Sequence, residues 1–301
     1  MADYSNDVMF ITGGASGAGF GHAQVFGRAG AAIVVADIRQ DAVDEAVAKL
    51  AAEGIRAHGI QLDITDRAAY AAAADEVEAV FGKTVTILSN TAGVNSFGPV
   101  ERTTYDDFDW IIDVNLNGVI NGMVTFVPRM IAAGTPAKIV TVSSLGGLGG
   151  SALAAPYSAA KAGVINLMES YNMSLSKYNI DVSVVCPANI KSNIADATKL
   201  RPAHLANSGY VENEESRASL ESIHQHGMEP ETLAQHIMNG LEAKQLYIIP
   251  YPECAGMVKA RFDQILDSIP SVETDPEGSK NRTDALMSWG ANGAKVFLKD
   301  K

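Results

Sequence analysis

Tyr157 and Lys161 lie four residues apart in a stretch with a helical pattern, residues 156–178. Residues at this spacing share one face of a helix, so a phenol and an ammonium can converge. A free tyrosine, with a pKa of about 10, is a poor base at neutral pH, but a nearby positive charge favours the phenolate and lowers that pKa. The pair is therefore a candidate general acid–base, although the same spacing is common on ordinary surface helices.

Ser144 is the second candidate. It follows a β-branched run, residues 138–142, thirteen residues before Tyr157. Ligands bind at the carboxyl ends of strands in parallel sheets, so a hydroxyl here could donate a hydrogen bond to a substrate oxygen. A cap of the following turn is the alternative role.

A glycine-rich segment, Thr12-Gly-Gly-Ala-Ser-Gly-Ala-Gly19, joins the first predicted strand to the first predicted helix. Glycines let the backbone turn tightly, and a helix amino terminus offers free N–H groups to a pyrophosphate. The segment could be a plain strand–helix turn, but the strand–loop–helix–strand context favours a dinucleotide site. The residues that we expect to contact the cofactor here are Gly13, Ser16, Gly17, Ala18 and Gly19.

Asp37, with Ile38 beside it, ends the next predicted strand, about 20 residues after the glycine segment. A carboxylate there can accept hydrogen bonds from the adenosine ribose and repels a 2′-phosphate. We therefore predict NAD as the cofactor, with NADP left open by the nearby Arg39.

Short apolar runs alternate with helical patterns along the chain, which predicts repeated βαβ units and a doubly wound parallel seven-stranded sheet, the Rossmann fold. The runs are 8–12, 32–36, 57–62, 85–89, 138–142, 181–186 and 246–249, and the helical patterns are 17–30, 41–53, 66–81, 104–133, 156–178 and 229–244. We predict one domain, 1–301. It includes a long substrate-loop region, 188–228, and a C-terminal helical extension, 252–301, with a helical pattern near 255–268.

Composition excludes several classes of function. The net charge of −12 disfavours a nucleic acid or an anionic membrane as partner. The polar start argues against a signal peptide, and no apolar stretch nears the length of a membrane helix. The two cysteines predict neither a disulfide framework nor a metal site, in keeping with a cytoplasmic protein. Cys186 lies in an apolar run and should be buried.

The motifs together resemble the classical short-chain dehydrogenases/reductases, over residues 8–250. In that family the tyrosine is the general acid/base, the lysine lowers its pKa and binds the nicotinamide ribose, the serine positions the substrate oxygen and an asparagine holds a water in a proton relay. The resemblance implies these roles for Tyr157, Lys161, Ser144 and Asn115. It also implies cofactor contacts for Asp63, Ile64, Asn90, Ala92, Gly93, Pro187, Ile190 and Ser192. Two residues depart from the family pattern, Thr91 in place of a second asparagine and Ala188 in place of a glycine.

Four segments are further similar to the Cα-dehydrogenases of sphingomonad lignin catabolism: 90–98, 104–110, 187–194 and 208–215. That resemblance implies NAD-dependent oxidation of the benzylic alcohol of β-aryl ether dimers such as guaiacylglycerol-β-guaiacyl ether, and a homodimer or homotetramer. Candidate pocket residues are Val94, Phe97, Leu145, Leu153, Asn189 and the loop near Tyr210. The alternatives are an enzyme for a steroid, sugar or acyl ketone, and a cofactor-sensing regulatory protein without catalysis.

Overall fold

The computed structural model describes residues 3–192, 194–211 and 213–297. Asn193 and Glu212 of the predicted loop region, and residues 298–301 of the predicted extension, lie outside the described residues. The chain divides into two compact units, one that ends at Glu253 and one that begins at Cys254.

The first unit is built on the predicted sheet. Seven parallel strands run in the order β3-β2-β1-β4-β5-β6-β7, which confirms the doubly wound fold. They are β1 (Val8–Thr12), β2 (Ala32–Asp37), β3 (Ala57–Gln61), β4 (Ile87–Asn90), β5 (Ala137–Val142), β6 (Ile180–Val185) and β7 (Tyr247–Ile248). The order reverses between β1 and β4, and ligands bind at such a switch point.

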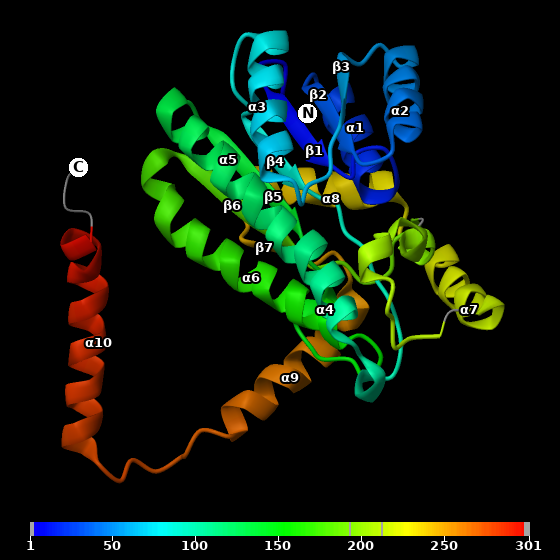
Figure 1. The fold of residues 1–301 in the computed structure, drawn as a ribbon. Helices are drawn as coiled ribbons and strands as arrows, with labels where there is room; N and C mark the ends of the chain where they lie inside the picture. Colours follow the sequence, from blue (N-terminus) through cyan, green and yellow to red (C-terminus); the bar gives the residue numbers. More distant parts are fainter. Residues whose placement is uncertain (1–2, 193, 212, 298–301) are drawn as a thin grey trace. The chain divides into compact units, whose positions relative to one another are not determined.

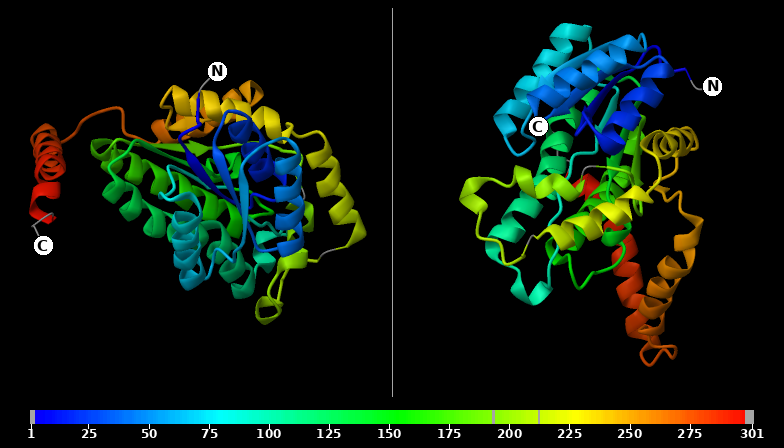
Figure 2. Two further views of the ribbon diagram at one scale, coloured as in Figure 1. Left: turned by 90° about the horizontal axis from the view of Figure 1, so that it is seen from above. Right: turned by 90° about the vertical axis from the view of Figure 1, so that its right-hand side faces the viewer.

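Helices cover both faces of the sheet (Figures 1 and 2). On one face α3 (Arg67–Phe81), α5 (Gly118–Ala133) and α6 (Ala155–Leu175) bury residues such as Tyr70, Phe126 and Met168 against the strands. On the other face α1 (Gly17–Arg28), α2 (Gln40–Ala52) and α8 (Pro230–Glu242) form a second apolar layer. Cys186 is fully buried in the first layer, as predicted.

The predicted helix 104–133 is not one regular helix. It begins as α4 (Tyr105–Ile112), passes through a π-helical turn at Asp113–Asn117 and continues as α5. Such turns shift the register of the side chains and often mark functional sites. The stretch Tyr105–Ala133 also corrects the expectation that no segment has the length and apolarity of a membrane helix, although 56% of its most apolar window is buried inside the protein, as in core helices.

The predicted loop region has more structure than its sequence suggested. It contains short 3₁₀ turns at Ile194–Leu200 and Ala203–Leu205, and the helix α7 (Glu214–Gln225). The second compact unit holds α9 (Ala255–Asp267), as predicted, and a further helix, α10 (Pro276–Phe297), that the sequence pattern did not indicate. Its glycines and mixed polarity give α10 no clear apolar stripe, which is why periodicity misses it.

Candidate active site

A cavity of about 640 Å³ opens where the strands of the first unit end. It brings together nearly all of the predicted site residues, which come from loops far apart in sequence. These are Gly13, Ser16, Gly17, Ala18, Gly19, Asp37, Ile38, Asp63, Ile64, Ala92, Gly93, Ser144, Tyr157, Lys161, Pro187, Ile190 and Ser192. Asn90 and Asn115 are the two predicted residues that do not line it.

The glycine loop needs its glycines for two separate reasons. Gly13 has φ +64° and a Cβ there would lie 2.8 Å from the Cα of Ala92, while Gly17 has φ +50° and its Cβ would lie 3.0 Å from that of Ser192. Side chains therefore cannot enter either position without strain. The loop delivers the amino terminus of α1 to the cavity, where unpaired N–H groups favour an anion.

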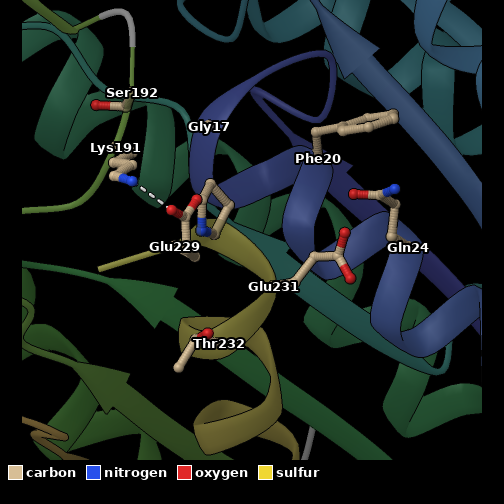
Figure 3. Close-up of a pocket in the computed structure, with 9 residues that line it drawn as sticks. Gly17, Phe20, Gln24, Lys191, Ser192, Glu229, Glu231 and Thr232 are labelled. Carbon is tan, nitrogen blue, oxygen red and sulfur yellow. Dashed lines mark hydrogen bonds and ion pairs between the residues drawn. The ribbon is translucent and has the colours of Figure 1, made fainter. Parts of the chain in front are cut away.

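A second cleft, of about 600 Å³, shares Gly17 and Ser192 with the larger cavity, and its lining residues are drawn in Figure 3. Residues of α1, among them Phe20 and Gln24, line it together with the first turn of α8, including Thr232. Of its three charged groups, Lys191 and Glu229 form an ion pair with one another, and Glu231 pairs with Arg28 of α1. The cleft holds none of the predicted acid–base residues, so the chemistry belongs to the larger cavity.

Asp37 is buried at the end of β2 and carries a partner that the sequence only hinted at. Arg39 donates from Nε to Oδ1 at 3.1 Å and from Nη2 to Oδ2 at 3.2 Å, and the same Nη2 donates to Ser16 Oγ at 3.2 Å. This end of the cavity thus carries a carboxylate and a guanidinium side by side, and the carboxylate is the more buried of the two, at 7% against 34% side-chain exposure.

Tyr157, Lys161 and Ser144 converge on the cavity. Lys161 Nζ lies 5.6 Å from the Tyr157 ring centroid and donates to the carbonyl of Val142 at 2.9 Å. Ser144 Oγ accepts the N–H of Gly146 at 3.0 Å, so the serine both caps the turn and faces the cavity.

We predicted that a nearby positive charge lowers the pKa of Tyr157, but the groups of the protein itself shift that pKa in the opposite direction. Burial raises that pKa, and a hydrogen bond with Ser144 opposes the rise only in part. Burial also lowers the pKa of Lys161 to about 8. Both shifts have one physical cause, because a desolvated site disfavours the phenolate and the ammonium alike.

Asn115 sits in the π-helical turn and is fully buried. Its side-chain amide donates to the carbonyl of Val94 and accepts the Val94 N–H, both at 2.8 Å. The side chain therefore holds the segment after β4 in place, and a role in a proton relay would fall to its main chain. Asn90 is also buried, and its amide donates to Thr141 Oγ1 at 3.1 Å rather than facing the cavity.

Sequence reasoning missed the apolar wall of the cavity. Trp110 lines it, together with Ile194, Ala197 and Leu205 of the loop region, and these residues pack in one cluster with Val94. Of the candidate pocket residues only Val94 is on the wall; Phe97, Leu145, Leu153, Asn189 and Tyr210 are not. Only the spatial return of the loop region to α4 reveals this wall. Among the described residues no three histidine, cysteine, aspartate or glutamate side chains gather as a metal site requires.

A doubly wound sheet, a glycine loop and a Tyr–Lys–Ser set at the strand ends define a nicotinamide-dependent oxidoreductase. The chain belongs to the short chain dehydrogenase family, whose model matches residues 7–202. It is an alcohol dehydrogenase in type, and the family implies a nicotinamide cofactor.

Individual relatives match the chain over more of its length than the family model does. The chain is 68% identical over 297 residues to the C alpha-dehydrogenase of Sphingobium sp. (strain NBRC 103272 / SYK-6), an alignment that covers 99% of this chain and 97% of that protein. The apo structure of LigD from Sphingobium sp. strain SYK-6 matches with a TM-score of 0.77 and 60% identity, over 90% of this chain and 100% of that chain. A short chain dehydrogenase/reductase from Burkholderia phymatum, solved in complex with NAD, matches with a TM-score of 0.84 and 28% identity, over 91% and 100% of the two chains. The predicted resemblance is confirmed.

Proposed function

We propose that this chain is an NAD-dependent Cα-dehydrogenase, which oxidises the benzylic alcohol of lignin-derived β-aryl ether dimers such as guaiacylglycerol-β-guaiacyl ether to the ketone. The observation that carries the proposal is the 68% identity to a C alpha-dehydrogenase over almost the whole chain. The Tyr157, Lys161 and Ser144 set at the cavity supports it, because benzylic oxidation needs a base beside the alcohol.

The cavity fits NAD. The amino terminus of α1 and the close-approach glycines suit the pyrophosphate, and Asp37 suits the adenosine ribose hydroxyls. Ile190 and Ser192 would contact the nicotinamide end. The chemistry that NAD⁺ supplies when bound is acceptance of the hydride from the benzylic carbon.

The chain's own residues handle the proton. Ser144 donates a hydrogen bond to the substrate oxygen, and the Tyr157 phenolate takes the hydroxyl proton as the carbon–oxygen double bond forms. Burial opposes that phenolate, so the positive charges near it, Lys161 above all, must offset the desolvation. Lys161 and the main chain of Asn115 then pass the proton outward.

The apolar wall of Val94, Trp110, Ala197 and Leu205 suits an aromatic substrate. A cavity of this kind, about 640 Å³ in volume, falls in the size range of small-molecule sites. Aryl rings can pack on this wall while the benzylic hydroxyl faces Tyr157.

The test is an assay of NADH formation with purified protein, NAD⁺ and a β-aryl ether dimer. We expect steady NADH production with the dimer, and much slower production with a steroid alcohol or a sugar alcohol. No oxidation of the dimer at millimolar concentration, or faster turnover of the other alcohols, would overturn the substrate assignment. A Tyr157→Phe protein provides the background rate.

Two further parts of the proposal concern the whole molecule. We expect a homodimer or homotetramer, and exposed apolar side chains on α5 and α6, Val124 at 62% and Met173 at 82%, support contact between copies. Sedimentation of the purified protein tests this, and a monomer at micromolar concentration would refute it. We also expect a cytoplasmic location, which cell fractionation tests.

A further inference from the structure

One buried carboxylate ties the loop region to α4. Asp107 lies in the first turn of α4 and is 0% exposed. It accepts hydrogen bonds from Arg201 Nη1 at 2.8 Å, from Ser208 Oγ at 2.8 Å and from the Gly209 N–H at 3.1 Å. Three donors from the loop therefore end on a single side chain of a helix about a hundred residues earlier in the chain.

Arg201 is the second half of this contact. Its side chain is 10% exposed, its Nε donates to the carbonyl of Leu205 at 2.5 Å, and its guanidinium carbon lies 5.1 Å from the centroid of the Trp110 ring. Its remaining nitrogen, Nη2, is buried with no hydrogen-bond partner among the described residues. The guanidinium thus joins α4, the loop and an aromatic side chain of the cavity wall.

Neighbouring contacts keep the same segment seated. Thr104 Oγ1 donates to the carbonyl of Asn207 at 2.6 Å, and the Tyr210 and Thr103 hydroxyls lie 2.6 Å apart. A Cβ on Gly209 would lie 1.6 Å from the carbonyl oxygen of Arg102, so only glycine fits there. These contacts pack the loop directly against α4 and the turn before it.

A buried ion pair contributes little net stability, because desolvation of both charges offsets most of their attraction. The unpartnered Nη2 adds to that cost. What such a pair can provide is one defined conformation of the segment that carries it. Here that segment also carries Leu200, Pro202 and Leu205, which line the cavity.

We propose that Asp107 and Arg201 are positioning residues, which hold the loop and Trp110 as a preformed wall for the aryl rings of the substrate. The substrate named here rests on the proposed function, whereas the anchoring of the loop does not. When the pair is broken, the closed loop is populated only part of the time, and the apparent affinity for substrate falls by that fraction. The acid–base groups and the adenosine end of the cavity should be unaffected.

The test is Arg201→Met, with Arg201→Lys and Ser208→Ala as milder variants in case the first folds poorly. Arg129→Met is the matched control, because it removes a surface arginine that pairs with Asp75 and Glu78 far from the loop contacts. We expect Arg201→Met to raise KM for the β-aryl ether dimer by about tenfold or more, with KM for NAD⁺ and kcat changed less than about threefold. The KM of Arg201→Lys for the dimer should lie between those of the wild type and Arg201→Met, because an ammonium can reach Asp107 but cannot also hold the Leu205 carbonyl.

Hydrogen exchange of the backbone amides at 207–210 provides a readout that does not depend on substrate. We expect these amides to exchange faster in Arg201→Met and in Ser208→Ala than in the wild type, and at the wild-type rate in Arg129→Met. If the wild type does not oxidise the dimer but exchange rises as expected, the proposed function fails and the anchor stands. Unchanged exchange and unchanged KM in Arg201→Met, or an equal fall of kcat with every alcohol tested, would overturn the anchor.

Discussion

Replacement of Asp37 by alanine tests how the adenosine end of the cavity selects its cofactor. In the wild type Asp37 is nearly buried, at 7% exposure, and is the main partner of Arg39. The substitution removes the acceptor for the ribose hydroxyls. It also leaves Arg39 with Ser16 as its remaining partner at this site, so a compensated pair becomes a net positive charge.

The magnitude follows from these contacts. A hydrogen bond to a charged group is worth roughly 1.5–3 kcal/mol, which corresponds to a loss of about 10- to 100-fold in kcat/KM for NAD. For NADP the repulsion disappears and the guanidinium can meet the 2′-phosphate, a partly exposed pairing worth up to about 1 kcal/mol, or about fivefold. The NAD/NADP preference should therefore fall by about 50- to 500-fold.

The assay is initial-rate kinetics of one alcohol with each cofactor, for Asp37→Ala and for Asp37→Ala/Arg39→Ala. The double variant should keep the loss for NAD but lose the gain for NADP. If the ratio in Asp37→Ala stays within about threefold of the wild type, Asp37 is not the selector. If the double variant uses NADP as well as the single one, Arg39 does not hold the phosphate.

Four further predictions concern the acid–base groups and the glycine loop. Tyr157→Phe should lower kcat by at least about 100-fold with little change in NAD binding measured by fluorescence titration; unchanged turnover would contradict its role. Because burial raises the pKa of Tyr157 and oxidation needs the phenolate, kcat/KM for the alcohol should increase with pH above neutrality, and a flat profile would speak against a phenolate base. Burial lowers the pKa of Lys161 from 10.5 to about 8, so the buried ammonium destabilises the folded state below pH 8, and this cost fades as the pH rises toward 10.5. Lys161→Met should therefore be inactive, yet its free energy of unfolding in urea at pH 7 should be higher by up to about 3 kcal/mol. A lower free energy of unfolding would refute this reasoning. Gly17→Ala should weaken NAD binding at least tenfold, because its φ of +50° and the approach of Ser192 leave no room for a methyl group; wild-type affinity would show that the loop can move aside.

Local pattern was enough to predict the scaffold. Buried parallel strands read as short apolar runs, and all seven lie where those runs predicted them. The glycine loop, Asp37 and the Tyr157–Lys161 spacing are also local signals, since each depends on residues within one strand–loop–helix unit. Their convergence on one cavity follows from the topology, because parallel strands place all their carboxyl ends at one edge.

The predicted helix 104–133 shows a structural feature that the sequence pattern could not predict. Its apolar periodicity continues across the π-helical turn, so the local sequence does not indicate that the side chain of Asn115 hydrogen-bonds to the backbone of Val94. Asn90, predicted to contact the cofactor, does not line the cavity, and its side-chain amide donates to Thr141 on the adjacent strand. Both outcomes depend on neighbours that are far away in sequence.

The sequence by itself therefore determined the fold and the family and singled out the candidate acid–base set, because those depend on short-range order that each segment carries alone. Tertiary structure decided the electrostatics and the wall of the site. The direction of the pKa shift of Tyr157 depends on how completely the fold removes water, and the pairing of Asp37 with Arg39 depends on side-chain geometry. The wall exists because Asp107 and Arg201, which no spacing rule connects, meet when the loop folds back onto α4.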